Sequence, residues 1–173
     1  MTEKSHKETL TTDNVRQPLY KRPLDLCVIT VAHICPLLLP VWILLWIFIP
    51  MMIWIEDRSP IFYRQKRVGK NGELFTVLKF RTMFDSQSQA DGAPTIPTVM
   101  NDPRVTRVGK LLRKTALDEL PQVLSILKGD MSFVGPRPMP VDLHGQFLDL
   151  GPEGARRVAV RPGLTGFAQV YGR

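Results

Sequence analysis

The sequence predicts a helix-dominated α/β domain with few, short strands, preceded by a re-entrant membrane helix that would make the chain a monotopic membrane protein. One apolar stretch without Asp, Glu, Lys or Arg covers residues 26–55, and about 20 apolar residues suffice to cross a bilayer core. The segment Glu73–Phe80 combines β-branched and aromatic residues with partial alternation, which is typical of a short strand. A helical apolar period occurs at four later positions, Leu120, Val123, Leu124 and Leu127.

Length and charge limit the classes of function. The 173 residues suit one domain with an appended membrane element. A net charge of +7 favours anionic partners, and nucleotides, lipid headgroups, pyrophosphates and nucleic acid all qualify. The two cysteines, Cys27 and Cys35, both lie in the apolar stretch, so neither a disulfide framework nor a zinc site is expected.

The membrane element is expected over residues 21–58, after a polar tail, residues 1–20, that we expect to be disordered. Basic residues flank the apolar stretch on both sides, with Lys21 and Arg22 before it and a further group that begins at Arg58. Basic residues next to membrane segments tend to stay cytoplasmic. A straight span would therefore leave one basic group on the wrong side.

Prolines also argue against one straight helix. Pro36, Pro40 and Pro50 interrupt the apolar stretch, and a proline inside a helix removes a backbone hydrogen bond and bends the helix. A helix that breaks and leaves by the face it entered satisfies both the charges and the prolines, so re-entry is favoured over a true span. Pro36 and Pro40 are the candidates for the break.

The cytoplasmic domain is expected over residues 59–173. A turn is predicted at residues 69–72, and a mobile loop at residues 86–97, which hold Ser, Gln, Gly and Pro without periodicity. Residues 104–114 form a basic amphipathic helix. Its charged face is either an ordinary solvated surface or a surface that lies on anionic headgroups.

Two adjacent carboxylates, Asp118 and Glu119, mark the start of the second predicted helix, which has Pro121 in its first turn and Gly129 at its end. A helix N-terminus stabilises carboxylates and attracts phosphate. An ionised aspartate can attack a phosphoryl centre, and a neighbouring carboxylate can hold Mg²⁺ together with substrate phosphates. From the spacing alone, a cap with a dipole partner is the commoner role of such a pair.

Three arginines lie next to Pro or Gly, namely Arg137, Arg161 and Arg173. Rigid loops that present guanidinium groups suit bidentate recognition of phosphate. Any one such arginine is more often a solvated surface residue, but three in similar settings favour a phosphate-binding role.

Five blocks of the sequence carry a family resemblance: KRPLD (21–25), SPIFYRQKRVG (59–69), FTVLKFRTM (75–83), the long block NDPRV…GPRP (101–138) and RPGLTGFAQVYGR (161–173). They are long, specific and in the same order along the chain. Together they resemble the bacterial sugar transferase family of monotopic phosphoglycosyl transferases, which initiate exopolysaccharide and glycoconjugate assembly.

The resemblance implies a reaction in two steps. Asp118, as the family's nucleophile, takes the phosphosugar from a UDP-sugar and UMP leaves. Polyprenyl (undecaprenyl) phosphate then attacks the covalent intermediate and becomes a polyprenyl-diphosphosugar. Glu119 is the partner carboxylate, and the resemblance implies that Asp118 and Glu119 hold Mg²⁺.

The resemblance also implies roles for residues outside the carboxylate pair. Lys21 and Arg22 match the basic pair that pins a proline-broken, re-entrant helix at the cytoplasmic face of the bacterial inner membrane, the proline here being Pro36 or Pro40. Arg113 is a candidate for the phosphate and nucleotide site. The same holds for the Pro-Arg-Pro element formed by Pro136, Arg137 and Pro138.

One departure from the family keeps a second function open. Family members usually continue beyond the position of Arg173, so we expect the chain to be truncated at its C-terminus. Such a loss favours a membrane-anchored nucleotide- or lipid-binding protein without turnover, whereas the intact Asp118–Glu119 pair favours the enzyme. A nucleic-acid-binding module is not expected, because the basic residues lack interleaved aromatic residues and any recognised motif.

Overall fold

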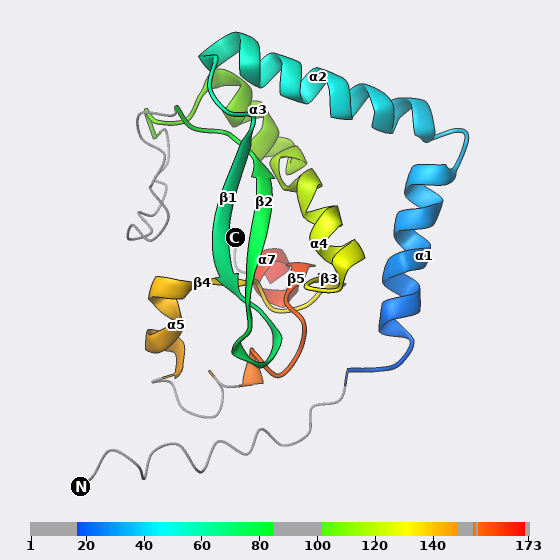
Figure 1. The fold of residues 1–173 in the computed structure, drawn as a ribbon, viewed down its shortest axis with the longest axis vertical. Helices are drawn as coiled ribbons and strands as arrows, with labels where there is room; N and C mark the ends of the chain where they lie inside the picture. The colour runs from blue at the N-terminus through cyan, green and yellow to red at the C-terminus, as the bar shows by residue number, and fades with distance from the viewer. Residues whose placement is uncertain (1–16, 85–101, 149–153, 155, 172–173) are drawn as a thin grey trace, which may run out of the picture.

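The computed structural model describes residues 17–84, 102–148, 154 and 156–171. The expected disorder of the N-terminal tail up to residue 16 and the expected mobility of residues 86–97 fall outside the described residues. Within them the chain is a helix-rich α/β protein with short strands, as the sequence predicts (Figure 1).

Two helices, α1 (Lys21–Ile34) and α2 (Leu39–Asp57), make up the predicted membrane element, and Pro36 lies in the connection between them. Pro40 lies in the first turn of α2, where a missing N–H costs nothing. Pro50 lies inside α2 without ending it. The helix therefore breaks at Pro36, and the prediction that all three prolines interrupt the stretch is wrong for Pro50.

The surface of α2 is apolar almost all round. Its mean hydropathy reaches 2.0 over 18 residues, and only 11% of that window is buried inside the protein. Ile49 and Ile53, one helical turn apart, are its buried residues. A core helix of a soluble protein would be mostly buried. By length and composition, α2 is thus suited to a bilayer.

The strands form two small sheets. In the first, β1 (Phe62–Val68) pairs antiparallel with β2 (Leu74–Phe80), and β4 (Met139–Pro140) adds to the other edge of β1. In the second, β3 (Ser132–Val134) pairs in parallel with β5 (Gly163–Thr165). The predicted strand is confirmed as β2, and the predicted turn is the short helix η1 (Lys70–Gly72) between β1 and β2.

The remaining helices are α3 (Arg107–Thr115), η3 (Leu117–Gln122), α4 (Val123–Lys128), α5 (Val141–Leu148) and α7 (Phe167–Tyr171). The predicted basic helix is confirmed as α3. The helix predicted to start with a cap at Asp118 begins instead as η3, a 3₁₀-helix with Asp118 in its first turn and Ala116, at a φ of 57°, before it. Gly129 ends α4 at a φ of 95°, as predicted.

The 3₁₀ start changes which side chains are buried. A 3₁₀-helix has 3.0 residues per turn instead of 3.6, so it rotates the following residues relative to an α-helical pattern. Ile126 is fully buried, whereas Leu124 and Leu127 of the predicted apolar stripe are 41% and 44% exposed. The predicted apolar period therefore does not coincide with the side chains that are buried.

The end of α2 is fixed to the start of α3. The carboxylate of Glu56 accepts hydrogen bonds from the backbone N–H groups of Arg107 (2.7 Å) and Val108 (2.9 Å), while Thr106 Oγ1 accepts from Gly109 N (2.8 Å) as the N-cap. The exposed face of α3 carries Arg107, Lys110, Leu111 and Lys114. Contact of this face with anionic headgroups stays a prediction.

The start of α1 is fixed to the same domain. Arg22 donates to the carbonyl oxygens of Ile126 and Leu127 (2.6 Å to the latter), which lie in the last turn of α4. One turn later, Asp25 is only 5% exposed, and its Oδ1 accepts hydrogen bonds from Ser132 Oγ and Phe133 N, both at 3.1 Å. Arg22 thus acts as a helix cap inside the protein.

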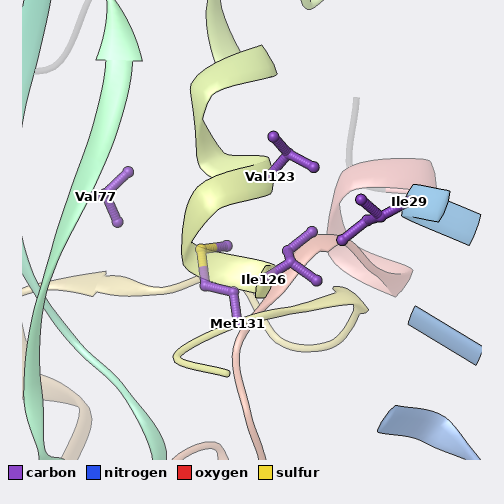
Figure 2. Packing of buried hydrophobic residues seen from close by; sticks show 5 residues of the cluster. All are labelled: Ile29, Val77, Val123, Ile126 and Met131. Carbon is purple, nitrogen blue, oxygen red and sulfur yellow. The ribbon is translucent and has the colours of Figure 1, made fainter. Parts of the chain in front are cut away.

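Both arms of the membrane element share a core with the rest of the chain. Figure 2 shows the first cluster, in which Ile29 of α1 packs with residues of β2 and α4 and with Met131. In the second cluster, Ile49 and Ile53 of α2 pack against Phe80 and Leu112. The positions of α1 and α2 relative to the sheet are therefore set by buried contacts.

Candidate active site

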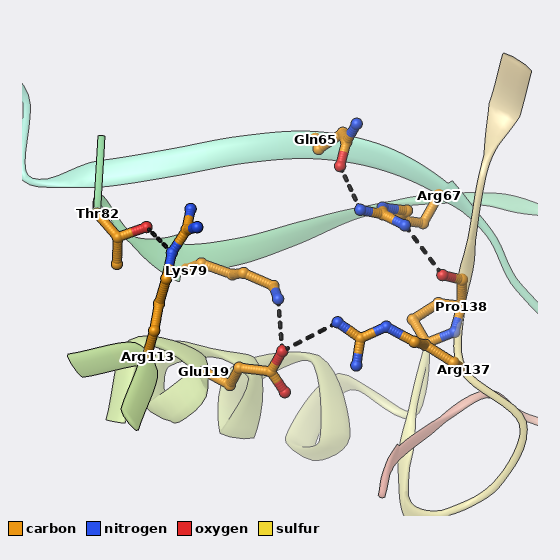
Figure 3. Close-up of polar contacts among 8 residues, drawn as sticks. All are labelled: Gln65, Arg67, Lys79, Thr82, Arg113, Glu119, Arg137 and Pro138. Atoms are coloured by element: carbon orange, nitrogen blue, oxygen red, sulfur yellow. Dashed lines mark hydrogen bonds and ion pairs between the residues drawn. The ribbon is translucent and has the colours of Figure 1, made fainter. Parts of the chain in front are cut away.

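The two carboxylates lie half-buried on η3, which packs against β2. Glu119 Oε1 forms two ion pairs, with Lys79 Nζ at 2.5 Å and with Arg137 Nη2 at 3.4 Å (Figure 3). Burial alone would raise the pKa of Glu119, but the ammonium of Lys79 and then the guanidinium of Arg137 outweigh it and lower that pKa below its usual value. Glu119 is therefore ionised at neutral pH.

Asp118 has a different environment from its neighbour. Within the described residues its carboxylate forms no ion pair. Burial raises the pKa of Asp118 above its usual value, and the nearby charge of Lys79 only partly offsets this. A poorly solvated carboxylate with no ion-pair partner is the more nucleophilic of the two.

Arg137 is held by the two prolines beside it. The carbonyl oxygen of Pro136 accepts from Gly163 N at 2.8 Å, and that of Pro138 accepts from Arg67 Nη1 at 3.1 Å. Figure 3 shows the contact of Arg67 with Pro138 and the guanidinium of Arg137 directed toward Glu119. Burial and the charge of Arg137 lower the pKa of Arg67.

A further arginine, Arg113 of α3, lies near Asp118. Arg113 Nε donates to Thr82 Oγ1 at 2.8 Å, which links the end of α3 to the residues after β2. Burial lowers the pKa of Arg113, and the charge of Asp118 opposes that change. Arg113 and Arg137 therefore contribute positive charge from different elements to the surroundings of Asp118.

A cavity of about 700 Å³ joins these groups to the membrane element. Asp118, Glu119, Arg113 and Arg137 line its polar part, and α1 and α2 contribute an apolar wall composed mainly of Val28, Ile29, Ala32 and Trp42. The cavity therefore combines two arginines and two carboxylates with an apolar surface. Such a cavity suits a phosphate group attached to an apolar tail.

A second, smaller cavity of about 10 Å³ adjoins Glu119 and is lined by Arg67, Lys79, Gln122 and Arg137 among others. The buried amide nitrogen of Gln122 has no hydrogen-bond partner among the described residues. Three cations and one carboxylate give this pocket a net positive charge, and its volume is about that needed for a single water.

The structure brings together most of the predicted site residues. Asp118, Glu119, Arg113 and Arg137 line one cavity, and Pro136 and Pro138 position Arg137. Arg161 instead donates to Gln17 at 3.2 Å, so its role in substrate binding stays a prediction without support from the geometry. Arg173 lies outside the described residues.

Three residues of the site were missed by the sequence analysis, namely Arg67, Lys79 and Gln122. Lys79 had a usable signal, because it follows the apolar Val77 by two residues in the predicted strand and alternate residues of a strand share a face. A lysine on the inward face of a strand needs an anionic partner. No comparable pattern marks Arg67 or Gln122.

The carboxylates also meet the needs of a magnesium ion. Both cations contact Glu119 through Oε1, which leaves Oε2 for another ligand (Figure 3). The described residues contain no cluster of three or more metal-binding side chains. This set fits Mg²⁺, which commonly takes one or two carboxylates, with waters and substrate phosphates as its other ligands.

Comparison with known proteins places these residues in a family context. The model of a family described as bacterial sugar transferase matches residues 16–173. The exopolysaccharide production protein PSS of Rhizobium leguminosarum bv. phaseoli is 41% identical over 129 residues, which cover 73% of this chain and 64% of that protein.

Two further relatives carry names that describe a reaction. The UDP-glucose:undecaprenyl-phosphate glucose-1-phosphate transferase of Caulobacter vibrioides is 42% identical over 154 residues, covering 89% of this chain and 54% of that protein. The UDP-N-acetylgalactosamine-undecaprenyl-phosphate N-acetylgalactosaminephosphotransferase of Aeromonas hydrophila is 39% identical over 156 residues, covering 88% and 35%. This chain spans less than two thirds of the length of each relative named here.

Proposed function

Because the chain belongs to the bacterial sugar transferase family, we propose that it transfers a sugar phosphate from a UDP-sugar to polyprenyl phosphate and so initiates exopolysaccharide synthesis. The observation that carries this proposal is the position of Asp118. Its carboxylate, with no ion pair in the described residues, lines one cavity with Arg113, Arg137 and the apolar wall of α1 and α2. A soluble diphosphate and a lipid phosphate can both reach such a carboxylate.

In the first step the donor binds by its diphosphate. Arg113 of α3 and Arg137 of the loop after β3 offer guanidinium groups in the same cavity as Asp118, and Lys79 adds a third positive charge beside Glu119. Asp118 attacks the phosphorus that carries the sugar, the bond from that phosphorus to the bridging oxygen breaks, and UMP leaves with the oxygen. The chain then holds the phosphosugar as an acyl-phosphate on Asp118.

In the second step an oxygen of polyprenyl phosphate attacks the same phosphorus. The bond between Asp118 and phosphorus breaks, which returns the free carboxylate and gives a polyprenyl-diphosphosugar. Mg²⁺, held by Asp118 and Glu119, would neutralise charge on the diphosphate when bound. The ion pairs of Glu119 with Lys79 and Arg137 keep that carboxylate ionised and fixed in place.

The membrane element is proposed to be re-entrant, with residues 59–173 on the cytoplasmic side of the inner membrane. The supporting observation is that both of its ends bind the same domain: Arg22 and Asp25 at the start of α1, and Glu56 at the end of α2. A straight span would separate these ends by the thickness of a bilayer, about 30 Å.

Thiol labelling tests this topology. In a chain whose Cys27 and Cys35 are replaced by serine, Leu19→Cys lies just before α1 and Glu73→Cys lies in the domain, and both positions are exposed. A membrane-impermeant maleimide is expected to label neither cysteine in intact cells and both after permeabilisation. Labelling of one position from outside would establish a true span.

Release of UMP tests the reaction itself. Detergent-purified protein with Mg²⁺ and polyprenyl phosphate, given a panel of UDP-sugars, is expected to release UMP with one donor and to form the matching lipid diphosphosugar. Omitting the lipid limits UMP release to about one equivalent per protein. A protein that binds a UDP-sugar but releases no UMP with any donor would instead be the non-catalytic binding protein.

A further inference from the structure

His33 is the one described residue of α1 or α2 that brings an imidazole to the large cavity. Building on the two-step reaction proposed above, we propose that His33 Nε2 binds the phosphate of the lipid acceptor and receives its proton in the second step. The residue would then serve transfer to the lipid and not the formation of the intermediate on Asp118.

The location of His33 fits a lipid-borne phosphate. The residue lies half-buried in the last turn of α1, next to the connection that contains Pro36. It lines the same cavity as Asp118, on the wall that α1 and α2 contribute. An isoprenoid tail that follows the apolar side chains of this wall would bring its phosphate into the cavity from the side of His33.

Two contacts fix the imidazole ring. Nδ1 lies 2.9 Å from the carbonyl oxygen of Ile29. A carbonyl only accepts hydrogen bonds, so the neutral ring carries its proton on Nδ1, and Nε2 is left with a lone pair. The ring also stacks on Trp42 of α2, with centroids 4.5 Å apart and planes 16° from parallel. Among the described residues, Nε2 has no hydrogen-bond partner.

The acceptor carries a proton that such a nitrogen can take. A phosphate monoester, with a second pKa of about 6, keeps one P–O–H in roughly a tenth of its population at pH 7 and in most of it below pH 6. Nε2, as an acceptor, binds this monoanionic form, and the deprotonated oxygen is the better nucleophile. Nε2 accepts that proton while the oxygen attacks the phosphorus on Asp118. The P–O bond to Asp118 then breaks, and the proton passes to water when the product leaves.

The donor diphosphate does not need His33. Arg113, Arg137 and Lys79 all come from the domain, and their charges match the diphosphate without a group from the membrane element. His33 and the two arginines line the cavity from different elements. This division assigns the imidazole to the acceptor and the cations to the donor.

The two half-reactions can be measured separately, which makes the inference testable. Exchange of labelled UMP into the UDP-sugar without lipid reports the first step alone, and formation of the lipid diphosphosugar reports both. His33→Phe keeps an aromatic ring for Trp42 but removes both ring nitrogens. We expect exchange within about twofold of the unmodified chain and lipid transfer lower by about tenfold or more, with the loss greatest below pH 6, where the phosphate monoester keeps its proton.

A matched variant and a second readout complete the experiment. His144→Phe changes a histidine of α5, which lines neither cavity, and should leave both activities unchanged. Lipid transfer by His33→Phe at the unmodified rate would overturn the inference, as would an equal fall of exchange and transfer, because that pattern indicates a structural role. Absence of exchange in the unmodified chain would instead overturn the proposed reaction, and this inference with it.

Discussion

Asp118→Asn is expected to abolish both UMP exchange and lipid transfer, with each rate reduced by roughly 10³-fold or more, the scale of losses when a nucleophile is removed. The carboxamide has the same shape as the carboxylate but cannot form an acyl-phosphate that later releases the phosphosugar. The loss should therefore affect the first step and every step after it. This pattern differs from the loss expected for His33→Phe, which is confined to the second step.

A trapping experiment checks the intermediate directly. Protein mixed with a UDP-sugar labelled in the sugar, without lipid, is expected to retain label after denaturation, and hydroxylamine should release it because acyl-phosphates react with that reagent. Asp118→Asn should retain none. Asp130→Asn is the matched control, since it makes the same replacement just after α4, outside both cavities. Undiminished lipid transfer by Asp118→Asn would show a direct displacement without this nucleophile.

The stability of Asp118→Asn should also be informative. Burial raises the pKa of Asp118, which means that the folded protein disfavours the ionised form relative to the unfolded chain. A neutral asparagine removes this cost, so the variant is expected to unfold at the same temperature as the unmodified chain or higher. The same desolvation that costs stability makes the carboxylate reactive, a trade-off common in active sites.

Local sequence patterns predicted the elements better than the site. The alternation in β2, the basic periodicity of α3 and the glycine that ends α4 each depend on neighbouring residues, and all three are confirmed. The start of η3 was not predictable, because it depends on Ala116 adopting a left-handed conformation that any residue but glycine rarely adopts.

The contacts around Glu119 were beyond local patterns for a different reason. Lys79 precedes Glu119 by 40 residues and Arg137 follows it by 18, and their meeting depends on how β2, η3 and the loop after β3 pack. Sequence patterns left two roles open for Asp118 and Glu119, a catalytic pair or a helix cap with a dipole partner. Only the family resemblance assigned the nucleophile. The positive charges of Lys79 and Arg137 beside the pair could be placed only from the fold.

Gly163→Ala is expected to destabilise the fold and disable the site together. A Cβ at Gly163 would lie 2.0 Å from the backbone N of Gly135 and 2.6 Å from its Cα, and neither can move without separating β3 from β5. The hydrogen bond from Gly163 N to the carbonyl oxygen of Pro136 would be lost as well. Overpacking and a lost buried hydrogen bond together suggest a cost of roughly 2–5 kcal/mol.

The loss of stability and the loss of activity can be measured separately. Thermal unfolding in detergent gives the first, and lipid transfer at a temperature where the variant is folded gives the second. Arg137 follows Pro136, so transfer should fall by at least about tenfold even in folded protein, because one misplaced hydrogen bond to a charged group is worth about 1.5–3 kcal/mol. Gly145→Ala on α5 is the matched control, since its Cβ would meet no atom within 4 Å. Equal stability of the two variants would mean that the approach of β3 to β5 does not hold Arg137 in place. The donor site would then depend on Arg67 and the carbonyl oxygen of Pro138 alone.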